Sequence, residues 1–350
     1  MQISGDRAIA KPDYTIKEFS KMNQDKMRCK HLYYNYDWSS FPDALMPRII
    51  REFLDNGANH FVFTTSLLQR ALNEPDFIGF LKNLEHEYGI KFGAMHALFS
   101  ENEKTGLSLP DPELRPAMLE TYIKSLQIAS EFEMNTVTVH SDAYFYVHNH
   151  TPLEKTRPFF QESLEILLPQ AEKYGVIIAI ENCFEKPNSA KEIVNFAAPY
   201  AGNPHLGFCY DTGHANIMSM APWKDKAMYG KVYPIPGFWT LEREWWEGIE
   251  FENDAFEKMK DNIVTCHIHD NNGYNDLHGM PYDGTIDWTT LLPSLRACPR
   301  MVEYQTEICY AHGFNWAGPL LAPKGGYSIK QVVETFQKMF PKQDCKRLYK

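Results

Sequence analysis

Short apolar runs alternate with amphipathic segments along most of this 350-residue chain. A β-type run at 31–36 is followed by an amphipathic segment at 42–56, whose apolar residues recur at helical spacing and which a glycine closes. A second run at 60–64 and a second helical segment at 77–88, again closed by a glycine, repeat the arrangement. Alternation of this kind predicts a parallel sheet whose strands are joined by helices.

The cycle continues into the C-terminal part of the chain. Further strands are expected over 90–95, 136–139, 176–180, 206–210, 263–266 and 301–306, with helical segments through 118–129, 164–171 and 193–198. Eight strands alternating with helices in a chain of this length predict an α/β fold, a single (β/α)₈ TIM barrel that spans residues 1–350.

Two segments depart from the repeat. Residues 1–26 read as a polar N-terminal arm without an apolar run. Between strands 6 and 7, a long insertion at 220–255 is rich in aromatic residues and proline. Aromatic side chains are enriched both in ligand pockets and at subunit contacts, so the insertion fits a pocket wall and a homo-oligomer contact equally well.

The composition limits the classes of partner and the cellular compartment that we expect for the protein. The chain has 45 acidic and 35 basic residues, a net charge of −10, whereas a nucleic-acid partner normally requires a basic face, so none is expected. No apolar window is long enough for a membrane span, and no signal peptide is visible. The seven cysteines form no Cys-x-x-Cys pair. Their odd number and apolar surroundings indicate a reducing compartment, and we expect a cytoplasmic protein.

Residues that can bind a metal follow successive predicted strands. In a parallel barrel the carboxyl ends of the strands meet on one face, so such residues would converge there. Packing alone rarely produces this series, because each buried charge needs a partner. A divalent-metal site is therefore expected. The strand-end residues are His96, His140, Glu181, Asp211, His267 and Glu307.

Three motifs resemble the xylose-isomerase-like TIM-barrel superfamily, which holds ketose epimerases, hydroxypyruvate and inosose enzymes, and endonuclease IV. The resemblance covers roughly residues 90–310. The motifs are Ala-Ile-Glu181-Asn, Tyr-Asp211-Thr-Gly-His214-Ala, and a loop that runs from His267-Ile-His-Asp-Asn-Asn-Gly through Asp276-Leu-His278 to Asp283-Gly-Thr-Ile-Asp-Trp288.

The resemblance implies one divalent ion (Mn, Mg, Co or Zn) and an isomerase or epimerase acting on a small sugar or sugar phosphate. In the family's sugar isomerases and epimerases, Glu, Asp, His and Glu hold the ion, which match Glu181, Asp211, His267 and Glu307 here. The ion would stabilise an enediolate, while Glu181 and Glu307 remove and return the proton. We prefer Glu307 to Glu303 because it lies at the strand's C-terminal end.

The same resemblance leaves alternatives open. Endonuclease IV holds three zinc ions through additional ligands, so this chain could hold up to three ions. A metal-dependent phosphoester hydrolase is therefore the second candidate function, and a metal-dependent lyase or dehydratase acting on a sugar-like substrate is the third. The acidic charge and the aromatic insertion favour the isomerase or epimerase. His269 and Asp270 are expected to support the ligands rather than bind metal. The additional metal or substrate ligands are matched by His96, His140, His214, Asp276 and His278.

Overall fold

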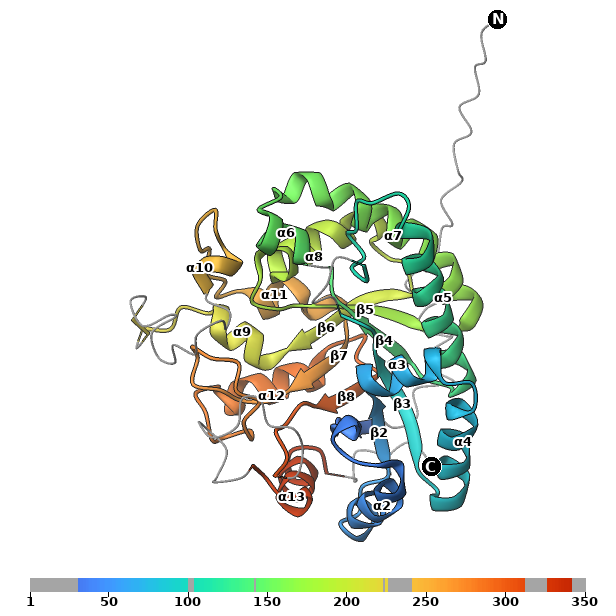
Figure 1. The fold of residues 1–350 in the computed structure, drawn as a ribbon. Helices are drawn as coiled ribbons and strands as arrows, with labels where there is room; N and C mark the ends of the chain where they lie inside the picture. Colours follow the sequence, from blue (N-terminus) through green and yellow to red (C-terminus); the bar gives the residue numbers. More distant parts are fainter. Residues whose placement is uncertain are drawn as a thin grey trace, which may run out of the picture.

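Eight parallel strands close into one barrel in the computed structural model of the chain (Figure 1). They follow one another in chain order, and four residue pairs, from His31–Glu303 to Tyr34–Thr306, join the first strand to the last. The strands are β1 (His31–Tyr34), β2 (His60–Phe63), β3 (Lys91–His96), β4 (Thr136–Val139), β5 (Ile177–Glu181), β6 (Leu206–Asp211), β7 (Ile263–Ile268) and β8 (Glu303–Thr306). The structure describes residues 31–99, 104–141, 143–222, 224–225, 241–311 and 326–341.

Helices surround the barrel and cover the outer face of its strands (Figure 1). The α-helices are α2 (Met46–Asp55), α3 (Thr65–Asn73), α4 (Phe77–Tyr88), α5 (Arg115–Glu131), α6 (Tyr144–Asn149), α7 (Leu153–Tyr174), α8 (Ala190–Ala197), α9 (Thr212–Met218), α10 (Leu241–Glu244), α11 (Ala255–Met259), α12 (Trp288–Ala297) and α13 (Ile329–Met339). Short 3₁₀ turns lie at Trp38–Ser40, Asp43–Leu45, Lys186–Asn188, Ala198–Tyr200 and Lys260–Asn262.

The predicted (β/α)₈ barrel is confirmed. Every observed strand begins and ends within two residues of the range expected from the sequence. Helix α8 begins at Ala190 rather than at Ile193, because the Glu252 carboxylate accepts the Ala190 and Lys191 backbone N–H groups at 2.8 Å each. That acidic cap comes from about sixty residues further along the chain, where no local pattern reveals it.

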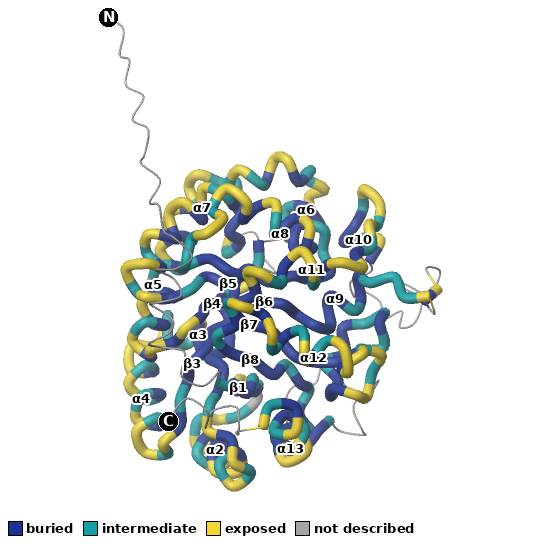
Figure 2. Tube along the Cα trace, turned by 180° about the vertical axis from the view of Figure 1, so that it is seen from behind, coloured by how far each residue is buried: buried dark blue, intermediate teal, exposed yellow. Residues whose placement is uncertain are grey.

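The main apolar core lies between the strands and the surrounding helices, as the buried strands and the exposed outer helix faces in Figure 2 show. Inside the barrel the packing is made by small or slender groups. Tyr33, Val62 and Ala94 form one inner cluster, and Ala179, Cys209 and Val264 form another. Among the described residues, no helix combines the length and apolar character that a membrane crossing needs.

The N-terminal arm lies outside the described residues, and so do residues 223 and 226–240 of the aromatic insertion, which include Trp223, Tyr229, Tyr233, Phe238 and Trp239. Two of its tryptophans are described. Trp245 is buried and donates its indole N–H to the Phe184 carbonyl at 2.6 Å, and Trp246 donates to the Tyr146 carbonyl at 2.9 Å. This end of the insertion therefore packs against the loop after β5 and against α6.

His148 and His150 are both exposed at the end of α6. His148 lies in the last turn of α6, and His150 ends that helix with a left-handed φ of 48°. The Arg243 guanidinium lies 3.0 Å from His148 Nε2. The contact joins α6 to α10.

A glycine-to-alanine pair tests the barrel packing. A Cβ built on Gly93 would lie 2.1 Å from Tyr33 Cε1 inside the barrel, whereas one on Gly79 of α4 meets nothing within 4 Å. We expect Gly93→Ala to lower the free energy of unfolding by about 1–3 kcal/mol through overpacking. The control Gly79→Ala should instead raise it, by up to about 1 kcal/mol, because alanine favours the helix. Urea unfolding measures both, and equal effects of the two substitutions would contradict the packing described.

Candidate metal centre

The strand-end residues predicted from the sequence meet at the carboxyl end of the barrel. His96, Glu181 and Asp211 are the last residues of β3, β5 and β6. His267 is the next to last residue of β7, and His140 and Glu307 directly follow β4 and β8. Parallel strands bring these ends to one face, so residues more than two hundred positions apart become neighbours.

Three carboxylates face a single imidazole nitrogen in the middle of this face. His267 Nδ1 lies 2.9 Å from Glu181 Oε1, 3.6 Å from Glu307 Oε2 and 3.9 Å from Asp211 Oδ2. The side chains of His267, Glu181 and Asp211 are at most 2% exposed. Three negative groups so close together need a shared positive partner. Their donor set of carboxylate oxygens and one nitrogen suits a divalent ion.

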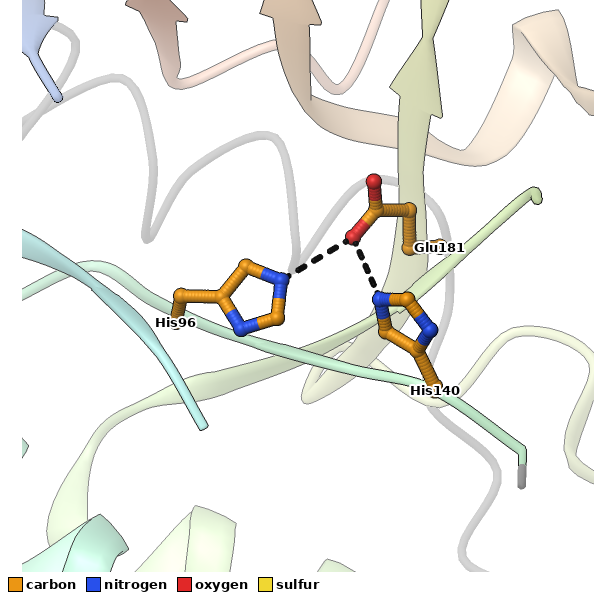
Figure 3. Close-up of side chains that lie close together, drawn as sticks. All are labelled: His96, His140 and Glu181. Atoms are coloured by element: carbon orange, nitrogen blue, oxygen red, sulfur yellow. Dashed lines mark hydrogen bonds and ion pairs between the residues drawn. The ribbon is translucent and has the colours of Figure 1, made fainter. Parts of the chain in front are cut away.

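On one flank of this group, two histidines share the other oxygen of Glu181. Figure 3 shows His96 and His140 reaching Glu181 Oε2 from two neighbouring strands, with Nε2 distances of 3.3 Å and 3.0 Å. Glu181 thus faces His267 with one oxygen and His96 and His140 with the other. A carboxylate with both oxygens engaged in this way can bridge two cation positions.

The other flank is built on Asp276. The Nε2 atoms of His214 and His278 lie 3.5 Å and 3.1 Å from Asp276 Oδ2. Asp276 Oδ1 is buried and has no hydrogen-bond partner among the described residues. A buried carboxylate oxygen without a partner is costly, and a cation held with the two histidines would remove that cost.

Three of these histidines have their ring protons placed by the backbone. The Nδ1–H group of His96 donates to the Ala97 carbonyl at 2.9 Å. The same group of His214 donates to the Asn182 carbonyl at 3.0 Å, and that of His278 donates to the Glu307 carbonyl at 2.9 Å. A carbonyl only accepts, so in a neutral ring Nε2 carries the lone pair, which points at a carboxylate oxygen. That arrangement is unfavourable unless a proton or a metal ion lies between the two atoms, and it is the usual orientation of metal-binding histidines.

The electrostatics of the ion-free protein reflect this arrangement. Burial raises the pKa of Asp276, but the facing His278 and His214 outweigh burial and hold it well below its usual value. Burial lowers the pKa of His278, but Asp276 outweighs burial and raises it to about 9. Glu181 behaves like Asp276, with His267 and His140 as the opposing groups. These pKa shifts favour protonated imidazole groups opposite the carboxylates in the ion-free protein.

The loop that carries Asp276 and His278 is organised by Asp270. Its carboxylate accepts the Asn271 N–H at 2.8 Å, the Tyr282 N–H at 3.1 Å and the Trp288 indole N–H at 2.7 Å. Gly284 must be glycine, because a Cβ there would lie 2.2 Å from Asp270 Oδ1. The Asp-Gly-Thr-Ile-Asp-Trp part of the motif therefore wraps around Asp270, which has the supporting position expected for it.

The structure separates Glu307 from Glu303. Glu303 begins β8 and is fully buried in the barrel interior, where it accepts hydrogen bonds from Thr136 and Asn135. Burial raises its pKa to about 8. Glu307 lies beside His267 with its side chain 16% exposed, and Asn35 Nδ2 donates to it at 3.5 Å. Only Glu307 of the two faces the carboxyl end of the barrel.

The sequence reasoning missed Asn35, Phe99 and the contact of His269 with Asp211. Phe99 is 46% exposed and its ring lies 5.7 Å from that of His96 and 5.8 Å from that of His140. Asn35 and Phe99 follow β1 and β3, so their places after strands were the available signal. For His269, alternation along a strand puts it on the same side as His267.

The chain belongs to the xylose isomerase-like TIM barrel family, whose model matches residues 55–316. Solved structures with the same fold include L-ribulose 3-epimerase (TM-score 0.63, 14% identity, 91% of this chain and 96% of that one). A D-tagatose 3-epimerase-like protein aligns with TM-score 0.61 and 16% identity over 91% of this chain and 98% of that one. The IOLI protein with a zinc atom aligns with TM-score 0.57 and 14% identity over 92% of this chain and 99% of that one.

One curated relative is the uncharacterised protein y4fM of Sinorhizobium fredii (strain NBRC 101917 / NGR234). It is 26% identical over 126 residues, which are 35% of this chain and 30% of that protein. The match thus spans about a third of the relative's length. Family membership consequently rests on the family model, which covers most of the chain.

The raised pKa of His278 predicts how pH changes the stability of the ion-free protein. Its folded value of about 9 exceeds its unfolded value of 6.5, so the stabilisation is complete below about pH 6.5 and is lost as the pH rises through about 9. A bound divalent ion displaces this proton, so ion affinity should increase over the same range. Thermal unfolding of ion-free protein between about pH 6 and pH 10 measures the first effect. His278→Gln should reduce the loss of stability at high pH. If the pH dependence of stability in this variant matched the wild type, the raised pKa of His278 would be contradicted.

Proposed function

We propose that the protein is a divalent-metal-dependent sugar or sugar-phosphate isomerase or epimerase. One observation carries the proposal: Glu181 and Glu307, from different strands, both face His267 Nδ1, at 2.9 Å and 3.6 Å. Two carboxylates beside one cation position suit a reaction in which a carbon-bound proton is removed and returned. Family membership and the epimerases among the structural neighbours support the same reaction class.

Glu181, Asp211, His267 and Glu307 would hold the central ion, which fits their carboxylate and imidazole atoms. The zinc atom in the IOLI structure supports a metal in this fold. When bound, the ion supplies positive charge that stabilises the negative oxygen atoms of an enediolate. His267 presents Nδ1 to all three carboxylates, so this nitrogen would be the atom that binds the ion.

The two glutamates have unequal access to water, and this divides their roles. The Glu307 side chain is 16% exposed, so a proton that it takes exchanges readily with solvent. The Glu181 side chain is 2% exposed and meets His96 and His140 through Oε2, so its proton stays within that group. One carboxylate removes the proton from the substrate carbon, and the other returns a proton to form the product.

Phe99 supplies an apolar wall for the substrate. It is one of the few large hydrophobic side chains exposed among the described residues, and its ring stacks on His140 with centroids 5.8 Å apart. Sugar rings present C–H groups on their faces and hydroxyl groups at their edges. An exposed aromatic ring beside charged ligands therefore suits a sugar with its hydroxyl groups turned toward the ion.

A second candidate function is phosphoester hydrolysis with three ions, and one observation favours it. The Nε2 lone pairs of His96, His214 and His278 point at carboxylates on both flanks, as two additional ions would require. The net charge of −10 argues against a nucleic-acid substrate, because phosphate backbones attract basic surfaces. An epimerase would use the same flanking histidines to bind substrate hydroxyl groups.

Ion stoichiometry separates the two functions. The isomerase or epimerase predicts one tightly bound divalent ion per chain, measured by elemental analysis after dialysis, and the hydrolase predicts three. Asp276→Asn should leave a one-ion protein at one ion and reduce a three-ion protein to two, because Asp276 belongs only to the second flank. Three ions in the wild type together with phosphodiesterase activity would replace the first proposal by the second.

Replacing each glutamate tests the proton transfer. Glu181→Gln and Glu307→Gln should each reduce solvent-deuterium incorporation into a ketose substrate by at least about 100-fold, because acid–base groups contribute about 10²–10⁴-fold. NMR of substrate incubated in D₂O measures the incorporation. Glu303→Gln is the matched control: it makes the same change in the barrel interior, and the folded variant should exchange at the wild-type rate. Wild-type exchange in either test variant would rule out the two-glutamate scheme.

A further inference from the structure

His269 meets Asp211 in a way that differs from every other histidine contact described above. Its Nε2 lies 3.0 Å from both carboxylate oxygens of Asp211, and its side chain is fully buried. The next carboxylate oxygen, Asp276 Oδ1, is 4.0 Å away. His269 thus points along the axis of one carboxylate rather than into the space between several.

The protonation of the ring follows from its surroundings. His269 Nδ1 is buried and has no hydrogen-bond partner among the described residues, whereas Nδ1–H of His96, His214 and His278 donates to a backbone carbonyl. Because two carboxylate oxygens face Nε2, the ring proton is best placed there, and Nε2–H donates to Asp211. His267 Nε2 also lacks a hydrogen-bond partner among the described residues, so the two histidines differ in what the other ring nitrogen faces. His267 Nδ1 faces three carboxylates, whereas His269 Nε2 faces both oxygens of Asp211.

This contact completes the support of Asp211. Its Oδ1 also accepts the His214 backbone N–H at 2.6 Å, and Asn182 bonds the Asp211 backbone N–H and carbonyl at 2.9 Å and 3.1 Å. The backbone of Asp211 is therefore fixed by one neighbour, and its carboxylate plane by His214 and His269. Oδ2 is left facing His267 Nδ1, on the side of the central cation position.

The turn after β6 is shaped to hold the His269 ring. Thr212 Oγ1 accepts the His269 backbone N–H at 3.1 Å and donates to its carbonyl at 2.7 Å. A Cβ on Gly213 would lie 2.0 Å from His269 Cε1, so any larger residue there would displace the ring. Each residue of the Asp211-Thr212-Gly213 turn therefore contacts His269, which also stacks on His278 with centroids 4.2 Å apart.

We propose that His269 is a positioning residue that orients the Asp211 carboxylate for the central divalent ion without itself binding the ion. The inference rests on the proposed metal site. It assigns Gly213 a role as well, since only glycine leaves room for the ring. It also explains why His267 in β7 and His269 directly after β7 have different roles. His267 faces the ion position, and His269 faces one of the ion's ligands.

Cobalt(II) binding to the ion-free protein tests the proposal. We expect His269→Phe, which keeps a ring and removes the donor, to weaken binding of the tightest cobalt(II) ion by about 10–100-fold, the usual effect of losing a hydrogen bond to a ligand. His269→Gln, whose amide N–H can reach the same oxygens, should restore binding to within a few-fold of wild type. Calorimetry gives affinity and stoichiometry, and the visible cobalt(II) spectrum reports ligand geometry. His205→Phe is the control: it removes the hydrogen bond between the His205 ring and the Val176 carbonyl and should leave cobalt(II) binding unchanged.

Two outcomes would overturn the proposal. Wild-type affinity and spectrum in folded His269→Phe would show that the contact does not position Asp211. Loss of one whole equivalent of cobalt(II) in both His269→Phe and His269→Gln would show that His269 is itself a ligand. If the wild-type protein binds no divalent ion, the proposed metal site fails first, which distinguishes that result from a failure of the His269 role.

Gly213→Ala provides an independent test if His269→Phe folds poorly. The added methyl group should weaken cobalt(II) binding in the wild-type background by displacing the ring. In a His269→Ala background, where no ring is present, the same substitution should cause no further loss. Equal losses in the two backgrounds would show that the glycine acts without His269, and would refute the coupling between them.

Discussion

The compensation of buried negative charge governs the carboxyl end of this barrel. Glu181, Asp211 and Asp276 are almost fully withdrawn from water, and Glu307 is only slightly exposed. Isolated carboxylates in such a place would be strongly destabilising, so each is opposed by imidazole groups or by backbone N–H donors. Histidine can serve this purpose with a proton or with a metal ion, which makes the same arrangement tolerable in both states.

The barrel makes this concentration of charge feasible. Its interior holds two small apolar clusters and hydrogen-bonded polar groups such as Glu303 with Thr136. The charged residues are carried by strand ends, whose backbone geometry the parallel hydrogen bonding already determines. The loop after β7 is not held by strand hydrogen bonds. Its backbone is held instead by Asp270, whose carboxylate accepts hydrogen bonds from three backbone N–H groups and one indole N–H.

The histidines of the site differ in what their ring nitrogens face. His96, His214 and His278 donate Nδ1–H to backbone carbonyls and leave Nε2 directed at carboxylates. His269 lacks such an acceptor and directs Nε2 at one aspartate. Residue type alone does not distinguish a ligand from a residue that orients a ligand. The distinction arises from what a ring nitrogen faces: His267 Nδ1 faces three carboxylates, whereas His269 Nε2 faces both oxygens of Asp211.

The barrel and the candidate ligand residues could be predicted from local patterns in the chain: apolar runs of strand length, glycines after helices, and acidic or histidine residues where each run ends. Other contacts could not be predicted, because no local pattern shows which distant residues meet in the folded chain. The Glu252 cap of α8, the hydrogen bond between Glu303 and Thr136 and the pairing of His269 with Asp211 join residues that are 58–167 positions apart in the chain. Such contacts depend on the closed barrel, since only closure brings distant strand ends together.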